Sequence, residues 1–331
     1  MTGWSSAFLL TAVLLLIGTP GAAAAADEAG RPLFAFTDRA IAESSGLVDT
    51  GAVVYTVNDS GSGPVLYAVD PRSGDTTRRT TYTPDEVEDV EALAPGRAGT
   101  VWVADVGDNQ RSRDSVSLYR ARHGATTTAP RLDLAYPDGP RDAETLLAHP
   151  RTGRLFVVSK TVFGGTVYAV PAGARPGGTL TMRRFAQVPG LITDGAFLPD
   201  GRHVVLRSYA TATVFTFPAF EVRGTFDLPE QRQGEAVSVS PRGRVLLSSE
   251  GVGAEVLQVE IPARLTRDVR PGSAPSASAA PVTPDPAADD PRPRDRPDRH
   301  PLALGLRLAA GLVFLGALGL GLRRLWRADR P

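Results

Sequence analysis

Oxygen-bearing side chains recur at corresponding places in this sequence, and their types are those that bind hard cations. The stretch VWVADVGDN, residues 101–109, begins as an apolar run around one tryptophan and ends in two aspartates and an asparagine. Comparable polar clusters flank the other apolar runs. Carboxylate and amide oxygens in a chain without cysteine favour Ca²⁺ or Mg²⁺ over zinc. The candidate metal ligands are Glu43, Asn58, Glu91, Asp105, Glu144, Asp194 and Glu235.

Five of these clusters lead into short apolar strands, and they can be aligned on the apolar residue that follows. The alignment places these residues at one equivalent position: Ser45, Glu91, Glu144, Asp194 and Glu235. Carboxylates that converge repel one another unless a cation, a shared proton or a basic side chain lies among them. Lys160 and Arg207 are basic side chains at the matching strand ends, so Glu144, Lys160 and Arg207 are the candidates for a catalytic role.

A structural interpretation stands beside the functional one. Aspartates at strand ends often form turns by accepting hydrogen bonds from nearby backbone amides. Asp59 lies just before Gly61, and Asp108 and Asn109 follow Gly107, as expected for tight loops.

Histidine offers no other chemistry at the acidic clusters. His149 and His203 fall in turns at the opposite ends of the strands, His123 in a loop and His300 in the proline-rich linker of residues 269–301. Neither a histidine metal site nor a histidine base is therefore expected beside the carboxylates.

The elements that must position these side chains form a repeat. Glycine-containing turns recur, and the steps from Gly51 through Gly99, Gly153 and Gly201 to Gly243 are 48, 54, 48 and 42 residues. Short β-branched and aromatic runs flank each turn, and no amphipathic helical period is present between them. A unit of about 40 to 50 residues with four strands is typical of a propeller blade. The sequence therefore predicts an all-β, five-bladed β-propeller over residues 31–268, with six blades as the alternative.

The last unit lacks its fourth strand, whereas the N-terminal part has a spare one, RPLFAFT at residues 31–37. We expect residues 33–37 to complete the last blade beside residues 256–261, which leaves no open edge. The fourth strands of the other units are predicted in TTRRTTYT, RLDLAYP, LTMRRFAQV and EVRGTFDL. In this topology the acidic clusters meet at one mouth of the central channel, and generic turns such as Pro-Arg-Thr-Gly occupy the other face.

Both ends of the chain indicate a membrane. Residues 1–26 are predicted to be a signal peptide, although no lysine or arginine precedes their apolar run. Residues 302–322 are long enough to cross a bilayer, with a buried hydrophobic helix as the alternative. The arginines of residues 323–331 predict a short cytoplasmic tail, which places the propeller outside the cell. Residues 269–301 are rich in proline and predict a semi-rigid linker.

Composition narrows the function classes. The 36 basic and 36 acidic residues balance, and no basic stripe with interleaved aromatic residues is present, so nucleic-acid binding is not expected. With no cysteine, the sequence has neither a disulfide nor a cysteine nucleophile. Lys160 is the one lysine, and this bias towards arginine indicates a GC-rich, actinobacterial genome.

The stretches ESSGL, VYTVNDSG, DVEALA, VWVADVGDN, YPDGPRDAETLL and RLFVVSK lie within roughly residues 41–170. Together they resemble motifs of exported bacterial β-propeller proteins of unassigned function. The resemblance implies a propeller and no particular reaction. A weaker similarity to gluconolactonase and regucalcin propellers implies a divalent cation at the channel mouth, for which Glu43, Asn58 and Asp194 would be the ligands, although those propellers usually have six blades. The Gly-His and Trp-Asp signatures of WD repeats are absent, so a WD-repeat assignment would rest on the fold alone.

Three functions are compatible with the sequence. The favoured one is a membrane-tethered propeller, not an enzyme, that binds a partner protein, a glycan or a small ligand at its acidic face. The second is a metal-dependent hydrolase of a lactone or phosphoester, with Glu43, Asn58, Asp105, Glu144 and Asp194 around a Ca²⁺-like ion. In the third, the ion is structural and plugs the channel.

Overall fold

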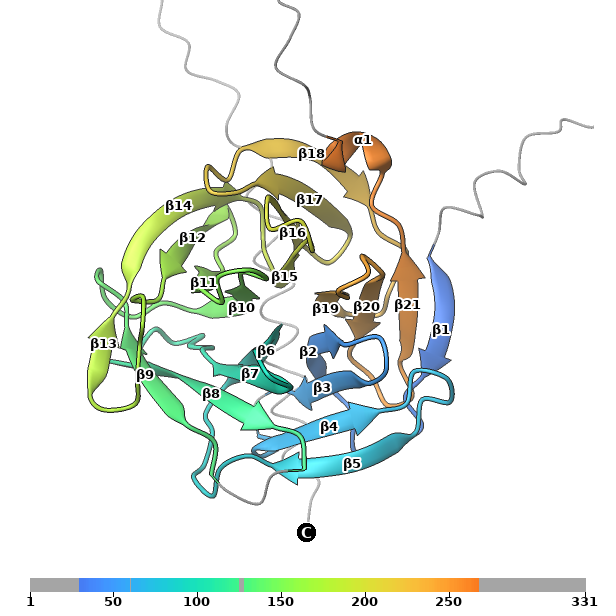
Figure 1. Ribbon diagram of the computed structural model, residues 1–331, viewed down its shortest axis with the longest axis horizontal. Coiled ribbons are helices and arrows are strands. Elements are labelled where there is room, and N and C mark those ends of the chain that lie inside the picture. The colour runs from blue at the N-terminus through green and yellow to red at the C-terminus, as the bar shows by residue number, and fades with distance from the viewer. Residues whose placement is uncertain (1–29, 60, 125–127, 268–331) are drawn as a thin grey trace, which may run out of the picture. The chain divides into compact units, whose positions relative to one another are not determined.

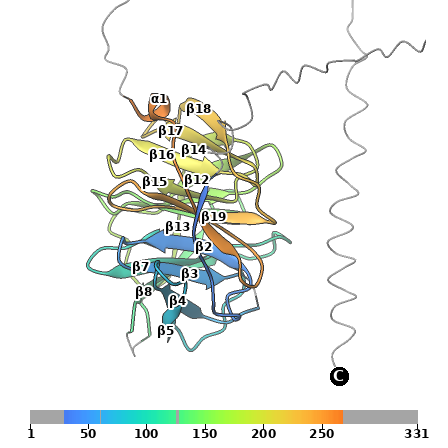
Figure 2. The same ribbon diagram turned by 90° about the vertical axis from the view of Figure 1, so that its right-hand side faces the viewer.

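The computed structural model describes residues 30–59, 61–124 and 128–267. Over these residues the chain forms twenty-one strands and one short helix, and the strands make five sheets around a central axis (Figure 1). Each sheet is one blade, and Figure 2 shows the ring of blades turned onto its side. The all-β, five-bladed propeller predicted from the sequence is confirmed, and the six-bladed alternative is wrong.

The blades follow one another along the chain, with the inner strand of each blade next to the axis. Blade 1 contains β2 (Ser44–Asp49), β3 (Val54–Asn58), β4 (Val65–Val69) and β5 (Thr76–Thr81). Blade 2 contains β6 (Val90–Pro95), β7 (Thr100–Asp105), β8 (Val116–Arg122), β9 (Arg131–Ala135) and β13 (Thr179–Thr181). Blade 3 contains β10 (Ala143–Ala148), β11 (Leu155–Ser159), β12 (Gly164–Ala169) and β14 (Arg183–Pro189). Blade 4 contains β15 (Asp194–Phe197), β16 (His203–Arg207), β17 (Thr211–Thr216) and β18 (Val222–Asp227). Blade 5 contains β19 (Gly234–Val239), β20 (Val245–Ser249), β21 (Glu255–Val259) and β1 (Arg31–Ala35), and helix α1 (Ala263–Thr266) follows β21.

The N-terminal strand closes the ring, as predicted. β1 pairs antiparallel with β21, from Arg31 opposite Gln258 to Ala35 opposite Glu255. The last blade is thus built from both ends of the propeller sequence, which protects the edge that β21 would otherwise expose. All described strands pair within these five sheets, so residues 30–267 contain the strand partners that the fold needs.

One predicted strand is wrong in its extent. The stretch LTMRRFAQV was expected to form the fourth strand of blade 3, but the chain divides it at Met182. Residues before Met182 form β13, which pairs in parallel with β9 of blade 2, and residues after it form β14 of blade 3. Met182 is buried in the apolar cluster between these two blades, and this burial accounts for the crossing from one sheet to the next.

The core is divided among the blade interfaces. Five apolar clusters are present in the described residues, one between each pair of neighbouring blades. The cluster between blades 5 and 1 contains Phe34 and Phe36 from the N-terminal segment, which explains why that strand is held in the last blade. The apolar packing between blades thus holds the five inner strands in place around the axis.

The segments predicted to meet the membrane lie outside the described residues. These are the signal peptide at 1–26, the linker at 269–301, the transmembrane helix at 302–322 and the tail at 323–331. Within the described part of the chain, no helix combines the length and apolar character that a membrane span requires.

Candidate functional site

One mouth of the channel is formed where the inner strands begin, and a β-bulge recurs there. In blades 1, 2, 3 and 5 the pairing of the inner strand shifts by one residue, and these residues occupy the bulge: Ser45, Glu91, Glu144 and Glu235. A bulge re-aims its side chain without ending the strand. The three glutamates are each only 5% exposed. We call this end of the channel, with Asp59, Asp89 and Lys160, the acidic mouth.

The three bulge glutamates act on one another electrostatically. Burial raises the pKa of Glu91 well above its usual range, and the charge of Glu144 raises it further. Burial raises the pKa of Glu144 to about 8, with Lys160 opposing this shift and Glu235 reinforcing it. Burial also raises the pKa of Glu235. The repeat therefore brings carboxylates from blades 2, 3 and 5 together, as the sequence predicts for these three residues.

Lys160 supplies positive charge among these acids. Its Nζ lies 2.5 Å from Glu144 Oε1 and 5.9 Å from the centre of the Tyr209 ring. Burial lowers the pKa of the Lys160 ammonium, but the attraction of Glu144 and Glu235 outweighs this effect and the pKa is raised. One lysine from blade 3 thus interacts electrostatically with acidic side chains from more than one blade.

Two aspartates join Glu91 in a group that could hold a metal ion. Ligand atoms of Asp59, Asp89 and Glu91 all lie within 4.8 Å of one another. Burial raises the pKa of Asp89 to about 7, and the neighbouring charges of Asp59 and Asp142 contribute. Three carboxylate oxygens at this spacing suit a hard cation such as Ca²⁺ or Mg²⁺. Sequence reasoning treated Asp59 as a turn former and did not include Asp89 among the ligands.

Gly107 explains how the VWVADVGDN strand end approaches this group. A Cβ atom on residue 107 would lie 2.4 Å from Asp89 Oδ2 and 2.7 Å from Glu91 Oε1. The backbone N–H of Gly107 donates to the Asp89 carbonyl oxygen at 3.1 Å. Glycine is thus required because the backbone itself forms the wall against which the two carboxylates lie.

Asn58 and Asp105 lie at the predicted strand ends, where their side chains accept hydrogen bonds from backbone N–H groups. Asn58 Oδ1 accepts hydrogen bonds from the N–H groups of Ala42 and Glu43, both at 3.2 Å. Asp105 likewise accepts from the N–H groups of Glu88 and Asp89, at 3.2 and 3.0 Å. These side chains position the segments that lead into the inner strands.

Two other interactions complete this scaffold. Arg113 Nη1 lies 2.8 Å from Asp105 Oδ1. Glu43 pairs through its backbone with Glu250, which links blade 1 to blade 5.

Blade 4 departs from the pattern of the other blades. Its inner strand has no bulge, and Asp194 lies directly opposite Arg207 instead of sharing the position of the bulge glutamates. Asp194 is fully buried, accepts a hydrogen bond from the Val237 N–H at 2.8 Å, and has its pKa raised well above the usual range by burial. The equivalence predicted for Asp194 is therefore wrong, because the sequence alignment could not detect the missing extra residue.

Arg207 also belongs to the interior. Its side chain is fully buried, and burial lowers its pKa to about 10. It donates to the carbonyl oxygens of Ala236 and Ser248 in blade 5 and to Gln231 Oε1. Arg207 thus joins blades 4 and 5 below the acidic mouth.

The loops around the acidic mouth expose apolar side chains. These loops join the second and third strands of their blades, and Phe163, the most exposed large apolar residue, is 93% accessible. The other exposed apolar side chains on these loops are Val162, Tyr209 and Val252. Tyr209 and Lys160 lie in contact across two neighbouring loops. Loops of three blades on the face of the acidic mouth therefore carry groups suited to contact with another molecule.

Comparison with known proteins gives similarities in structure alone. No protein-family model and no curated protein matches the sequence. A gluconolactonase from Xanthomonas campestris is similar at a TM-score of 0.42 and 17% identity, covering 64% of this chain and 70% of that one. A glucose dehydrogenase is similar at 0.43 and 13%, covering 66% and 84%. A luciferin-regenerating enzyme is similar at 0.44 and 12%, covering 70% and 96%. Gluconolactonase-type propellers, which the sequence resembles weakly, are thus also among the similar structures, and values this low carry nothing about activity.

Proposed function

We propose that the protein is an exported propeller, anchored to the cell membrane, that binds a divalent cation at its acidic mouth and uses this site to bind a partner or small ligand. The observation that carries the proposal is the convergence of Asp59, Asp89 and Glu91, with ligand atoms within 4.8 Å. A cation would neutralise carboxylates that otherwise lie close together in a partly buried place. Ca²⁺ and Mg²⁺ are the ions that all-oxygen sites prefer.

The site is suited to binding a second molecule. Three carboxylates from the protein do not complete the six to eight oxygen ligands that Ca²⁺ usually has, so a ligand with carboxylate, hydroxyl or phosphate oxygens can complete the set. The exposed side chains of Phe163 and Tyr209, on loops of the same face, would add apolar contact with such a molecule. This combination favours a polar ligand or a partner segment that carries an apolar group.

The experiment is a thermal melt of the fragment containing residues 27–270, with Ca²⁺, with Mg²⁺ and with chelator. An ion that binds the native state at 100 times its Kd adds about 2.7 kcal/mol, which corresponds to roughly 5 to 10 °C for a domain of this size. Glu91→Gln should remove most of the increase. Glu221→Gln, an exposed carboxylate in the turn between β17 and β18, is the matched control and should keep it. No shift with either ion in the native sequence would reject the proposed cation site.

A hydrolase is the second candidate function, and the position of Glu144 favours it. Its carboxyl has a pKa of about 8, it contacts Lys160 Nζ at 2.5 Å, and its charge acts on Glu91 of the cation group. A group that holds or releases a proton near neutral pH beside a cation can act as the general acid or base of metal-assisted hydrolysis. Glu144→Gln should abolish turnover of a lactone or phosphoester while the Ca²⁺ shift in the melt persists. Absence of turnover by the native sequence would leave the binding function.

The proposed anchoring rests on the sequences of residues 1–26 and 302–322, which lie outside the described residues. In a bacterial host, the full chain should fractionate with membranes and be digested by protease added to intact spheroplasts. A chain that ends at residue 270 should be released in soluble form. Recovery of the full chain from the soluble cytoplasm would reject the anchor.

A further inference from the structure

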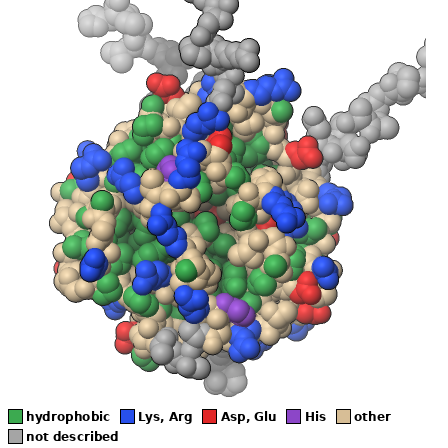
Figure 3. Space-filling model, viewed as in Figure 1, with side chains coloured by type: hydrophobic (Ala, Val, Ile, Leu, Met, Phe, Trp, Pro, Cys, Tyr) green, Lys and Arg blue, Asp and Glu red, His purple; other side chains and the backbone are tan. Residues whose placement is uncertain are grey.

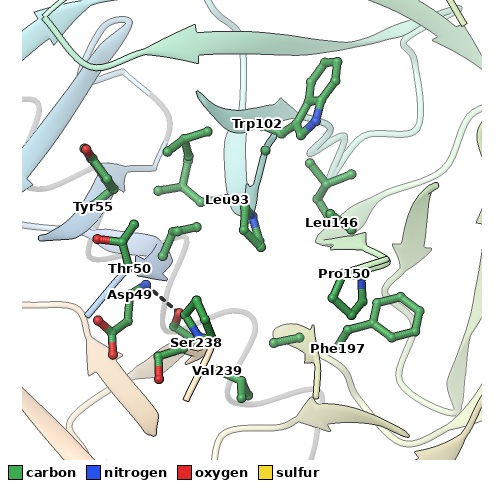
Figure 4. A pocket seen from close by; sticks show the side chains of 18 of the residues that line it. Asp49, Thr50, Tyr55, Leu93, Trp102, Leu146, Pro150, Phe197, Ser238 and Val239 are labelled. Carbon is green, nitrogen blue, oxygen red and sulfur yellow. Dashed lines mark hydrogen bonds between the residues drawn. The ribbon is translucent and has the colours of Figure 1, made fainter. Parts of the chain in front are cut away.

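The channel has a second mouth, where the inner strands end, and a cavity of about 670 Å³ opens there. One apolar residue from each of the five inner strands lines it: Leu47, Leu93, Leu146, Phe197 and Val237. Figure 4 shows Leu93, Leu146 and Phe197 around the central space, each from a different blade. A cavity of this size with apolar walls is typical of small-molecule sites. We call this end of the channel the apolar mouth.

Proline and arginine surround the apolar mouth. Pro95 at the end of β6 and Pro150, Pro199 and Pro241 in three turns line the cavity, and proline restricts the backbone at these positions before any ligand arrives. Arg97 and Arg120 also line the cavity, and both side chains lie on the surface. On the face seen in Figure 3, Lys and Arg side chains lie around a centre where hydrophobic side chains are visible.

The two arginines are held in place by uncharged groups. Arg97 Nη2 donates to the carbonyl oxygen of Arg151 at 2.8 Å, which leaves its other N–H groups for a ligand. The guanidinium of Arg120 lies 5.9 Å from the centre of the Trp102 ring, and Trp102 also lines the cavity. These contacts orient both cations without neutralising them.

The acidic residue of the cavity is already paired. Asp49 accepts hydrogen bonds from Arg244 Nε and Nη2, each at 2.7 Å, and from the N–H of Gly51 at 2.7 Å. Its own backbone N–H donates to Ser238 Oγ at 2.8 Å, the contact marked in Figure 4. Because Arg244 balances Asp49, the charges of Arg97 and Arg120 remain as a net positive rim.

His149 does not add a titrating charge to this rim. It is buried against Phe197, with ring centres 5.0 Å apart, and burial lowers its pKa. Its Nδ1 accepts hydrogen bonds from the N–H groups of Arg151 and Thr152, both at 3.2 Å. The imidazole is thus a neutral part of the wall, and the rim keeps its charge across the neutral pH range.

We infer that the apolar mouth binds a small amphipathic carboxylate, with its apolar body in the cavity and its carboxylate between Arg97 and Arg120. Arginine matches a carboxylate through paired N–H donors, and the walls offer an apolar body a preformed, partly enclosed space. A cationic head group would meet the positive rim, and a small anion without an apolar body would leave the cavity unused. This site is separate from the acidic mouth and does not depend on a bound cation.

The test is calorimetric titration of the residue 27–270 fragment with decanoate, and with decyltrimethylammonium as a ligand of equal chain length and opposite charge. Decanoate should bind at one site per chain, and its affinity should fall as salt is added because the head group contributes electrostatically. Arg97→Gln and Arg120→Gln should each raise the Kd about 10-fold, the loss expected for one charge-assisted hydrogen bond. Arg72→Gln, an exposed arginine in the turn between β4 and β5, is the matched control.

A second pair of measurements separates the cavity from general surface attraction. Ala196→Trp should fill the cavity and weaken decanoate binding while the melting temperature stays within a few degrees of the native value, and Glu91→Gln should leave binding unchanged. Absence of decanoate binding would overturn the inference. The inference would also be overturned if decyltrimethylammonium bound as tightly as decanoate, or if both arginine variants kept the native Kd. Binding of decyl phosphate in place of decanoate would overturn it as well.

Discussion

The two mouths of the channel are made from the two ends of the same five inner strands, and they differ in how charge is balanced. At the acidic mouth, Glu91, Glu144 and Glu235 share one lysine, and the pKa values of all three are raised. At the apolar mouth, Asp49 has its own arginine at 2.7 Å. Protein side chains alone therefore balance the buried charge at the apolar mouth, whereas the acidic mouth needs protons or a cation to balance its charges.

A single local feature accounts for much of this difference. The bulge at the start of four inner strands re-aims the residue that precedes the regular pairing, and three of these residues are glutamates. No bulge is present at the other ends, where the strands pair regularly into tight turns that each contain a glycine. A propeller can thus carry distinct chemistry at its two mouths without any change in the strands between them.

The largest expected effect comes from removing the strand that both mouths depend on. Deletion of residues 31–38 removes β1, exposes the edge of β21 and takes Phe34 and Phe36 from the cluster between blades 5 and 1. The variant should aggregate and lose both the Ca²⁺ response and decanoate binding. Soluble yield, gel filtration and a thermal melt check this, with Arg31→Ala as the control because that side chain is exposed. A soluble, cooperative deletion variant would show that closure of blade 5 is dispensable.

Removing the basic partner at each mouth should cause a smaller loss of stability, and the size of the loss should differ between the two mouths. Arg244→Met leaves the fully buried carboxylate of Asp49 without its cation, and we expect a loss of about 2 to 3 kcal/mol, since the arginine is itself partly exposed. Lys160→Met should cost about 1 kcal/mol at pH 6, because Glu144 keeps its proton there, and more at pH 8. Ca²⁺ should raise the stability of Lys160→Met by more than it raises that of the native protein, and should raise that of Arg244→Met only by the native increase.

Urea denaturation of the two variants at pH 6 and pH 8, with and without Ca²⁺, provides the measurement. Losses that are equal at both mouths and independent of pH would contradict the comparison. They would mean that the lysine and the arginine are both ordinary structural partners.

The sequence predicts the repeat well because turn residues and apolar strands are local signals. The turns predict five units and the structure has five blades, and the closing strand was placed beside the correct partner. The division of blade 3's last strand at Met182 was missed, because the burial that causes it depends on two neighbouring blades. Local patterns thus determine the units, and contacts between units determine where a strand ends.

The site was predicted less completely for the same reason. The glutamates of blades 2, 3 and 5 were found because they share one position, but Asp194 was assigned to that position although it lacks the bulge. Asp59 follows a strand of blade 1 and Asp89 precedes a strand of blade 2, and their approach to Glu91 follows from the packing of these two blades. The cavity at the apolar mouth was missed because its turns were interpreted as generic, although Arg97 was visible in one of them.

The pH dependence of stability tests the acidic mouth directly. The folded state holds Asp89 and Glu144 at pKa values of about 7 and 8, above the values of about 4 that carboxyl groups have in an unfolded chain. Between roughly pH 4 and pH 8 the folded protein therefore binds more protons than the unfolded one, and its free energy of unfolding should fall as the pH rises.

Urea denaturation in chelator at pH 5, 6.5 and 8 should show this decline, and Glu91→Gln should make it shallower by removing one of the repelling charges. Ca²⁺ should stabilise the protein more at pH 8 than at pH 5, since the cation then competes with fewer bound protons. Stability that rises across this range in chelator would mean that the carboxylates of the acidic mouth are ionised and already balanced, which would make the two mouths alike.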